Sequence, residues 1–385
     1  MSESVVIVGS GLAGYGVARE LRRLDSAVPI TMFSADHGGF YSKPMLSNAL
    51  ATGKTPDSIL NGDTDKMAGQ LDITIRSNTC VVSVNPAEKT ITLDDDEILP
   101  YSQLVMAMGA DQIRLPLQGD GVSKILTVND LDDYRHFREE LAGKKSVTVI
   151  GAGLIGCEFA NDLASADYEV HVIDISDQPL GRLLPSAGGE FIKSKLEAVG
   201  VVFHLNATTQ RVDLVDDRFC VTLEGDDEVI ESDIVLSAVG LKPRISMAEN
   251  AGIAVNRGIV VNQLLQSPQF KSIYALGDCA EIEGKVLPFV MPITHASRAL
   301  AATLAGNLTP VRYPAMPVMV KTPACPAVVS PPAADAKGEW HVDANQDGVK
   351  ALFQNESGGL LGFALLGDAV KEKNDLAKQL PPILP

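Results

Sequence analysis

Residues 147–163 read VTVIGAGLIGCEFANDL, and residues 5–21 read VVIVGSGLAGYGVAREL. Seven of the seventeen aligned positions are identical. Each stretch has an apolar, β-branched run, then the pattern G-x-G-x-x-G, then apolar residues at helical spacing, which predicts a strand, a tight turn and a helix. One such pattern is weak evidence for a nucleotide site, but two in the correct context predict two Rossmann-like dinucleotide-binding domains in one α/β chain.

The segments between and after these units indicate how the two domains are built. A buried-strand run that ends in glycine follows each unit, at residues 104–109 and 234–240, after a β-rich stretch. We expect a further strand over residues 272–276 and a helix over residues 296–304 to complete the first domain, because that helix pattern stops at a Gly-Asn pair. The first domain is therefore predicted to be discontinuous.

A change of character near residue 313 marks a third domain. Six prolines between residues 314 and 332 interrupt helices and confine strands to short pieces. Short strand patterns and an amphipathic helix follow, which predicts a small C-terminal α+β domain, and we expect the final PPILP to be frayed surface. The expected boundaries are residues 1–110 and 235–312 for the first domain, 111–234 for the second and 313–385 for the third.

Composition excludes several classes of protein. The 385 residues are 45% hydrophobic and carry a formal net charge of −17, which predicts a globular chain that binds neither nucleic acid nor anionic membranes. No apolar run of about 18 residues and no basic, apolar leader is present, so we expect a cytoplasmic protein without membrane insertion. The five cysteines are scattered without C-x-x-C, which argues against a disulfide framework or a metal centre. Any electrons handled here must reside on a bound organic cofactor.

The first glycine turn predicts a site for a dinucleotide diphosphate at the start of a helix. Its expected ligands are Gly9, Gly11, Leu12, Ala13 and Gly14. The acidic residue usual at the end of the next strand is displaced, because Ser34 stands there and Asp36 lies two residues beyond. We expect Ser34 and Asp36 to reach the ribose, and the alternative is that Asp36 is only a turn carboxylate.

The second glycine turn repeats the arrangement and adds a well-placed acid. Its expected ligands are Gly151, Gly153, Leu154, Ile155 and Gly156. Asp174 follows a strand pattern twenty-three residues after the first of these glycines, close to the spacing of about 20 for a carboxylate on the adenosine ribose. Because this carboxylate would repel a 2′-phosphate and no arginine follows within three residues, the sequence favours NADH over NADPH. The alternative is an exposed capping aspartate.

Together with residues 273–278, IYALGD, the two units resemble the two-dinucleotide-domain flavoprotein reductases of the pyridine nucleotide-disulfide oxidoreductase superfamily. The resemblance covers nearly the whole chain. It implies FAD in the first unit, NADH in the second, and Asp278 on the ribityl–phosphate part of FAD. It also implies that Pro44, Val82 and Gly109 belong to the FAD site and Gly240 to the NAD site.

Residues 41–47, YSKPMLS, distinguish between branches of that superfamily. They contain no cysteine, which excludes the branches that use a thiol in this segment. They are similar to the [YR]-x-[RK]-P-x-L-S segment of reductases that supply small iron proteins. In that group the lysine lies beside the flavin and pairs with a glutamate after the second fingerprint, which implies a catalytic pair of Lys43 and Glu158. The alternative is that both are ordinary charges.

The likeness is strongest to the rubredoxin–NAD reductases, and it includes residues 317–332, PVMVKTPACPAVVSPP. There it implies that Lys321 approaches FAD from the third domain. The expected reaction is hydride transfer from NADH to FAD and then single-electron transfer to rubredoxin. Two alternatives stay open: a reductase for a ferredoxin or flavorubredoxin, and a non-catalytic flavoprotein that senses NADH.

Overall fold

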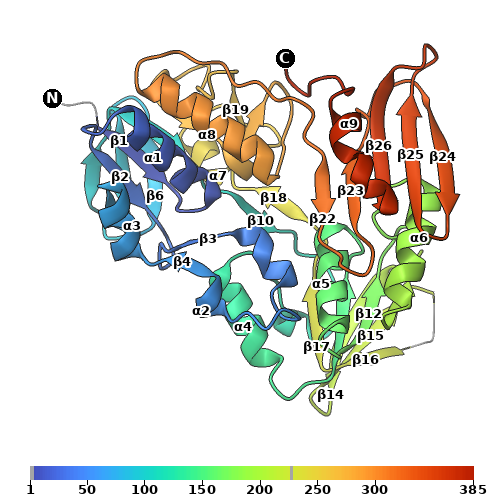
Figure 1. The fold of residues 1–385 in the computed structure, drawn as a ribbon. Coiled ribbons are helices and arrows are strands. Elements are labelled where there is room, and N and C mark those ends of the chain that lie inside the picture. The colour runs from blue at the N-terminus through green and yellow to red at the C-terminus, as the bar shows by residue number, and fades with distance from the viewer. Residues whose placement is uncertain (1–3, 226–228) are drawn as a thin grey trace.

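The computed structural model describes residues 4–225 and 229–385 (Figure 1). Residues 1–3, which the sequence assigned to the first domain, lie outside this range. Figure 1 shows three bodies around a common centre, with the chain passing from the first body to the second, back to the first and then to the third. The two crossing segments are β10 (Ala110–Gln112) and β18 (Leu241–Pro243), which pair antiparallel.

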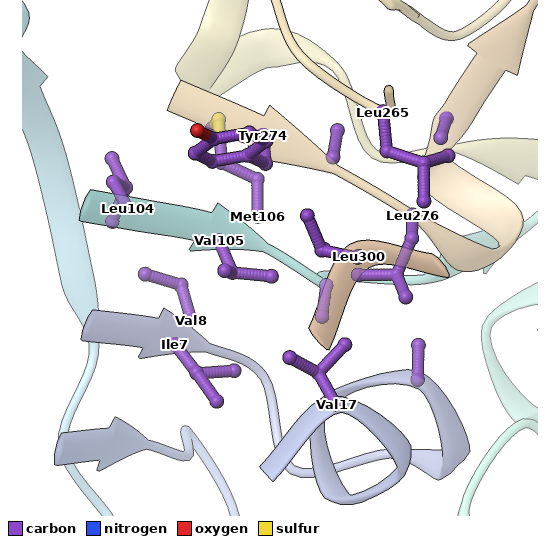
Figure 2. Close-up of a cluster of buried hydrophobic side chains, with 14 of the residues drawn as sticks. Ile7, Val8, Val17, Leu104, Val105, Met106, Leu265, Tyr274, Leu276 and Leu300 are labelled. Atoms are coloured by element: carbon purple, nitrogen blue, oxygen red, sulfur yellow. The ribbon is translucent and has the colours of Figure 1, made fainter. Parts of the chain in front are cut away.

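The first body is built on a parallel sheet of five strands in the order β20-β9-β1-β2-β5. The strands are β1 (Val5–Val8), β2 (Ile30–Phe33), β5 (Thr74–Arg76), β9 (Gln103–Met106) and β20 (Ile273–Ala275). Helices α1 (Leu12–Leu24) and α8 (Val290–Leu304) pack against each other. Figure 2 shows Val17 of α1 and Leu300 of α8 packed on the sheet. Strand β20, although it comes from far along the sequence, completes this core.

Smaller elements surround this sheet. They are β3 (Phe40–Tyr41), the 3-10 helix η1 (Lys43–Asn48), α2 (Pro56–Ile59), β4 (Leu60–Gly62), α3 (Thr64–Leu71), the meander β6 (Val81–Asn85), β7 (Thr90–Leu93) and β8 (Ile98–Pro100), α7 (Ser246–Asn250), and the pair β19 (Ile259–Val261) and β21 (Ala280–Ile282).

The second body has a parallel sheet in the order β13-β12-β11-β17. Its elements are α4 (Leu131–Glu140), β11 (Ser146–Ile150), α5 (Leu154–Ala164), β12 (Glu169–Ile173), α6 (Ser186–Glu197), β13 (Val201–His204), the meander β14 (Thr209–Val215), β15 (Arg218–Leu223) and β16 (Val229–Ser232), and β17 (Ile234–Ser237). The predicted boundary at residue 235 is wrong. Strand β17 pairs in parallel with β11, so the second domain continues to the end of β17.

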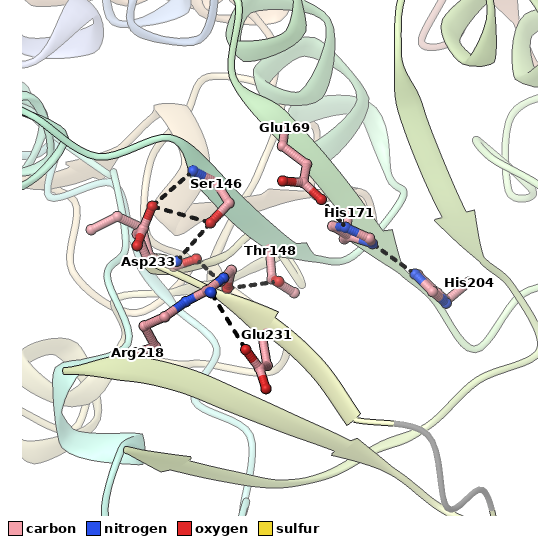
Figure 3. Close-up of polar contacts among 10 residues, drawn as sticks. Ser146, Thr148, Glu169, His171, His204, Arg218, Glu231 and Asp233 are labelled. Atoms are coloured by element: carbon pink, nitrogen blue, oxygen red, sulfur yellow. Dashed lines mark hydrogen bonds and ion pairs between the residues drawn. The ribbon is translucent and has the colours of Figure 1, made fainter. Parts of the chain in front are cut away.

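Polar contacts hold β17 to the start of β11 (Figure 3). Asp233 accepts hydrogen bonds from the amides of Lys145 and Ser146, at 2.8 and 3.0 Å. Thr148 bonds Ser232 at 2.9 Å. These bonds satisfy polar groups within and beside buried strands, where an unpaired polar group would cost stability.

The third body is an antiparallel sheet in the order β22-β23-β26-β25-β24 with helical turns at its end. Its elements are β22 (Val318–Val320), β23 (Ala327–Ser330), β24 (Glu339–Asn345), β25 (Gly348–Gln354), β26 (Leu360–Gly367), η4 (Asp368–Glu372) and α9 (Lys373–Ala377). Helix α6 of the second body packs against β25 and β26. The sheet of the third body therefore packs against the second body.

The prediction of a frayed C-terminus is wrong. Tyr313 donates its amide to the carbonyl of Leu384 at 2.8 Å, and the amides of Ile383 and Leu384 bond the carbonyl of Tyr313. Leu384 is 6% exposed and belongs to the core of the first body. The proline-rich end of the sequence suggested fraying, but the side chain of Leu384 packs in the core of the first body.

Replacing Leu384 by alanine tests this anchoring. We expect Leu384→Ala to lower the free energy of unfolding by about 2–4 kcal/mol, because a buried side chain is lost and leaves a cavity. Leu308→Ala, at a position that is 67% exposed, is the matched control and should change it by less than about 0.5 kcal/mol. Equal effects in urea unfolding would contradict a buried terminus.

Candidate active site

One continuous cavity of about 1580 Å³ lies where the three bodies meet. Both glycine turns line it, as do segments of the third body. Its volume exceeds the ~300–1,000 Å³ typical of a pocket for one small ligand. The space is therefore sufficient for two large ligands that touch each other.

The second glycine turn has the geometry that a diphosphate requires. Gly151 has φ +108°, and a Cβ at Gly156 would lie 1.8 Å from the carbonyl oxygen of Gly151, so both positions need glycine. A Cβ at Gly153 would meet nothing within 4 Å, and Gly153 lines the cavity. The first turn repeats this arrangement at Gly9, Gly14 and Gly11. Each turn thus leaves open space before a helix N-terminus, where a dinucleotide diphosphate would fit.

Both predicted ribose acids line the cavity. Asp36 accepts hydrogen bonds from the Ser34 hydroxyl at 2.5 Å and the Gly38 amide at 2.8 Å. Asp174 accepts from the amide of Ala152 at 2.5 Å and from that of Ser176 at 2.7 Å. Each acid therefore accepts hydrogen bonds within its turn and also lines the cavity. Asp174 in addition bonds the second glycine turn directly, through the amide of Ala152.

Other predicted residues divide into those that line the cavity and one that does not. The cavity is lined by Leu12, Ala13, Ser34, Pro44, Gly109, Leu154, Ile155, Gly240 and Asp278. Val82 does not line the cavity: the residue is 53% exposed, and the preceding Cys80 and Val81 form that part of the wall, so its place in the FAD site stays a prediction.

Glu158 does not pair with Lys43, so that prediction is wrong. Glu158 is fully buried and forms its ion pair with Lys321, which comes from the third body. The Lys321 amide also donates to Glu158 at 2.9 Å, and the Ser47 hydroxyl donates to the same carboxylate. A sequence pattern cannot show which of two lysines, far apart in the chain, reaches this carboxylate.

Lys43 lies elsewhere along the cavity wall. Its ammonium donates to the side-chain oxygen of Asn129 at 2.7 Å. Burial lowers the pKa of Lys43, and the nearby carboxylate of Asp278 opposes that shift. Burial likewise raises the pKa of Asp278, against the effect of Lys43. Lys43 and Asp278 therefore interact electrostatically in a region that is largely shielded from water.

Sequence reasoning missed Asn129 and the residues before the last helix of the first body. Helix α8 begins at Val290 rather than at residue 296, and Phe289, Val290 and Met291 line the cavity. An apolar run before a predicted helix was the available signal.

Within the described residues, no helix is both long and apolar enough to cross a bilayer.

Comparison with known proteins identifies the family. Residues 3–302 match the model of the pyridine nucleotide-disulphide oxidoreductases, and residues 310–380 match that of the rubredoxin binding C-terminal domain. The chain belongs to the pyridine nucleotide-disulphide oxidoreductase family. This membership confirms the predicted fold class and an oxidoreductase that uses FAD and NAD(H).

Full-length relatives support the same assignment. The chain is 47% identical over 381 residues to a rubredoxin-NAD(+) reductase of Alcanivorax borkumensis, covering 99% of each chain. It is 46% identical over 389 residues to a rubredoxin-NAD(+) reductase of Acinetobacter baylyi, covering 99% of this chain and 98% of that one. Among solved structures, a ferredoxin reductase from Rhodopseudomonas palustris matches with a TM-score of 0.88 and 25% identity, covering 98% and 95% of the two chains.

Two alanine substitutions in the second glycine turn separate folding from binding. We expect Gly156→Ala to destabilise the domain, because the new Cβ would meet the Gly151 carbonyl at 1.8 Å. We expect Gly153→Ala to keep the stability within about 1 kcal/mol and to weaken NADH binding at least tenfold, because its methyl group enters the open space. Thermal unfolding and NADH titration measure the two effects, and equal loss of stability in both variants would contradict this geometry.

Lys321→Met should lower the free energy of unfolding by about 3 kcal/mol, because Glu158 would keep a buried charge without its cation. The double variant Lys321→Met with Glu158→Gln should recover most of that loss. Lys371→Met, which breaks a surface pair with Asp368, is the control and should cost less than about 1 kcal/mol. A double variant no more stable than Lys321→Met would rule out this ion pair.

Proposed function

We propose that this chain is an NADH:rubredoxin oxidoreductase that works in the cytoplasm. The observation that carries the proposal is the pairing of a cavity large enough for two dinucleotides with a C-terminal body that matches a rubredoxin binding domain. The full-length relatives named above are rubredoxin-NAD(+) reductases, which supports the same partner. The five free cysteines agree with a reducing compartment.

FAD, when bound, accepts two electrons as hydride and releases them singly. The chain supplies the binding sites for FAD and NADH. We assign Gly9, Gly11, Gly14 and Asp36 to the FAD diphosphate and ribose, and Asp278 to the part of FAD nearest Lys43. We assign Gly151, Gly153, Gly156 and Asp174 to NADH. The open wall at each helix N-terminus and the two tied carboxylates support these assignments.

Two lysines line the cavity from different bodies. Lys43 comes from the first body and Lys321 from the third, and both line the wall. A cation in a desolvated site favours a neighbouring group that gains negative charge. We assign both lysines to stabilise negative charge on the reduced cofactor, with Glu158 holding Lys321 in place.

The mouth of the cavity offers an apolar surface to a partner protein. Val290 and Met291 of α8 and Met319 of β22 line the cavity and are 43–57% exposed. The net charge of −17 disfavours long-range attraction to an acidic rubredoxin. We therefore expect a small, transient contact that depends on this apolar surface, with rubredoxin reduction that does not rise steeply as ionic strength falls.

Stopped-flow mixing tests the proposal. NADH is first mixed with the FAD-loaded chain, and the reduced chain is then mixed with purified rubredoxin, a two-iron ferredoxin or a flavorubredoxin. We expect rapid bleaching of the flavin and then one-electron reduction of rubredoxin at a higher rate than of the other acceptors. Faster reduction of another acceptor would change the partner, and a stable reduced flavin that reduces none would favour an NADH sensor.

Asp174→Ala tests the choice of nicotinamide cofactor. We expect the variant to weaken NADH binding about tenfold and to improve the relative use of NADPH, because the carboxylate that repels a 2′-phosphate is gone. Asp177→Ala, three residues along the same loop, is the control. The ratio of kcat/KM for the two cofactors measures the effect, and an unchanged ratio would show that Asp174 does not contact the ribose.

A further inference from the structure

Helix α5 of the second body carries three buried polar side chains at one place. Glu158, Asn161 and Asp162 are 0, 2 and 4% exposed. Their spacing of three and four residues places them on one face of the helix. Buried polar groups are costly unless they are hydrogen-bonded, so the partners of this face indicate its purpose.

All three side chains bond residues outside their own body. Asp162 accepts hydrogen bonds from the amides of Leu50 and Ala51 in the first body, at 2.9 and 3.0 Å. Asn161 accepts from the amide of Ala324 in the third body at 3.0 Å. Glu158, as described above, bonds Ser47 of the first body and Lys321 of the third. We call Glu158, Asn161 and Asp162 the α5 staple.

The segments that the α5 staple holds are those that carry the two cavity lysines. Leu50 and Ala51 lie two and three residues after the end of η1, which begins with Lys43, and Ala324 is three residues from Lys321. The helix itself starts at the second glycine turn. One helix face therefore connects the NADH turn to both lysines, and Figure 1 shows α5 where the three bodies meet.

Burying the carboxylate of Asp162 at this junction costs free energy. Burial raises the pKa of Asp162, while the amides of Ala51 and Leu50 oppose that shift. Main-chain amides are fixed in direction, so a carboxylate that accepts two of them defines orientation as well as distance. An apolar contact of the same size would hold the bodies together but would allow them to slide.

We propose that Asn161 and Asp162 are positioning residues, which hold the second body at a fixed distance and angle from the segments that carry Lys43 and Lys321. The proposal rests on the function proposed above for its kinetic consequence, since hydride transfer needs reacting atoms about 3–3.5 Å apart. Its structural consequence is independent of that function. Loss of one staple bond should loosen the bonds that the other staple residues make.

Hydrogen–deuterium exchange of the FAD-loaded chain tests the structural part with Asp162→Asn. The matched control is Asp233→Asn, because Asp233 also accepts two successive amides but lies within the second body (Figure 3). We expect Asp162→Asn to speed exchange at least tenfold at residues 50–51 and also at 321–324, which Asp162 does not bond. The control should affect only residues 145–146. A change confined to residues 50–51 would overturn the proposal and make Asp162 a local cap.

Flavin reduction by NADH tests the kinetic part. We expect Asp162→Asn to lower the limiting rate about tenfold with the apparent NADH affinity unchanged within twofold, while Asp233→Asn keeps both values within twofold of the parent chain. Equal rates in Asp162→Asn and the parent would overturn the positioning role. If the parent fails to reduce rubredoxin, the proposed function fails, but the exchange result still decides the staple.

A second variant covers the case in which Asp162→Asn does not fold. Asn161→Ala removes the acceptor for the Ala324 amide and a 3.4 Å bond to Ser165 at the end of α5, and it leaves Glu158 and Asp162 unchanged. We expect it to speed exchange at residues 321–324 and, to a smaller extent, at residues 50–51. Unchanged exchange at residues 50–51 in a folded Asn161→Ala chain would show that the staple bonds are independent, which contradicts the proposal.

Discussion

The buried carboxylate of Glu158 is the constraint on which the arrangement of the three bodies depends. A charge removed from water is stable only when a cation and hydrogen-bond donors surround it. Here the donors are Ser47 of the first body and the amide and ammonium of Lys321 of the third. No single body satisfies this carboxylate, so its burial requires all three to meet.

The cavity follows from that junction. Two glycine turns, each at the end of a parallel strand and the start of a helix, face a common space only because the second body is held against the first. The third body then closes the wall with Met319 and Lys321. A site for two dinucleotides is therefore a property of the assembly of domains, whereas each diphosphate cradle is a property of one turn.

The family assignment and the geometry support each other at different levels. The comparisons identify an oxidoreductase family and a rubredoxin binding domain. The structure adds which residues of this chain lie at the cavity and which ion pairs form. Lys321, whose sequence position suggested only an approach to FAD, is the partner of Glu158, and Lys43 instead faces Asn129 and Asp278.

Local sequence was enough to predict the two glycine turns, the acid at Asp174, the lack of a thiol near Lys43 and the α+β character of the end of the chain. These features are local, because backbone conformation and strand or helix periodicity depend on near neighbours. The partner of Glu158, the membership of β17 in the second sheet, the exposure of Val82 and the burial of Leu384 emerge only in the folded chain. Each depends on contact between segments far apart in the chain, and a carboxylate or a leucine binds whichever partner the fold brings to it.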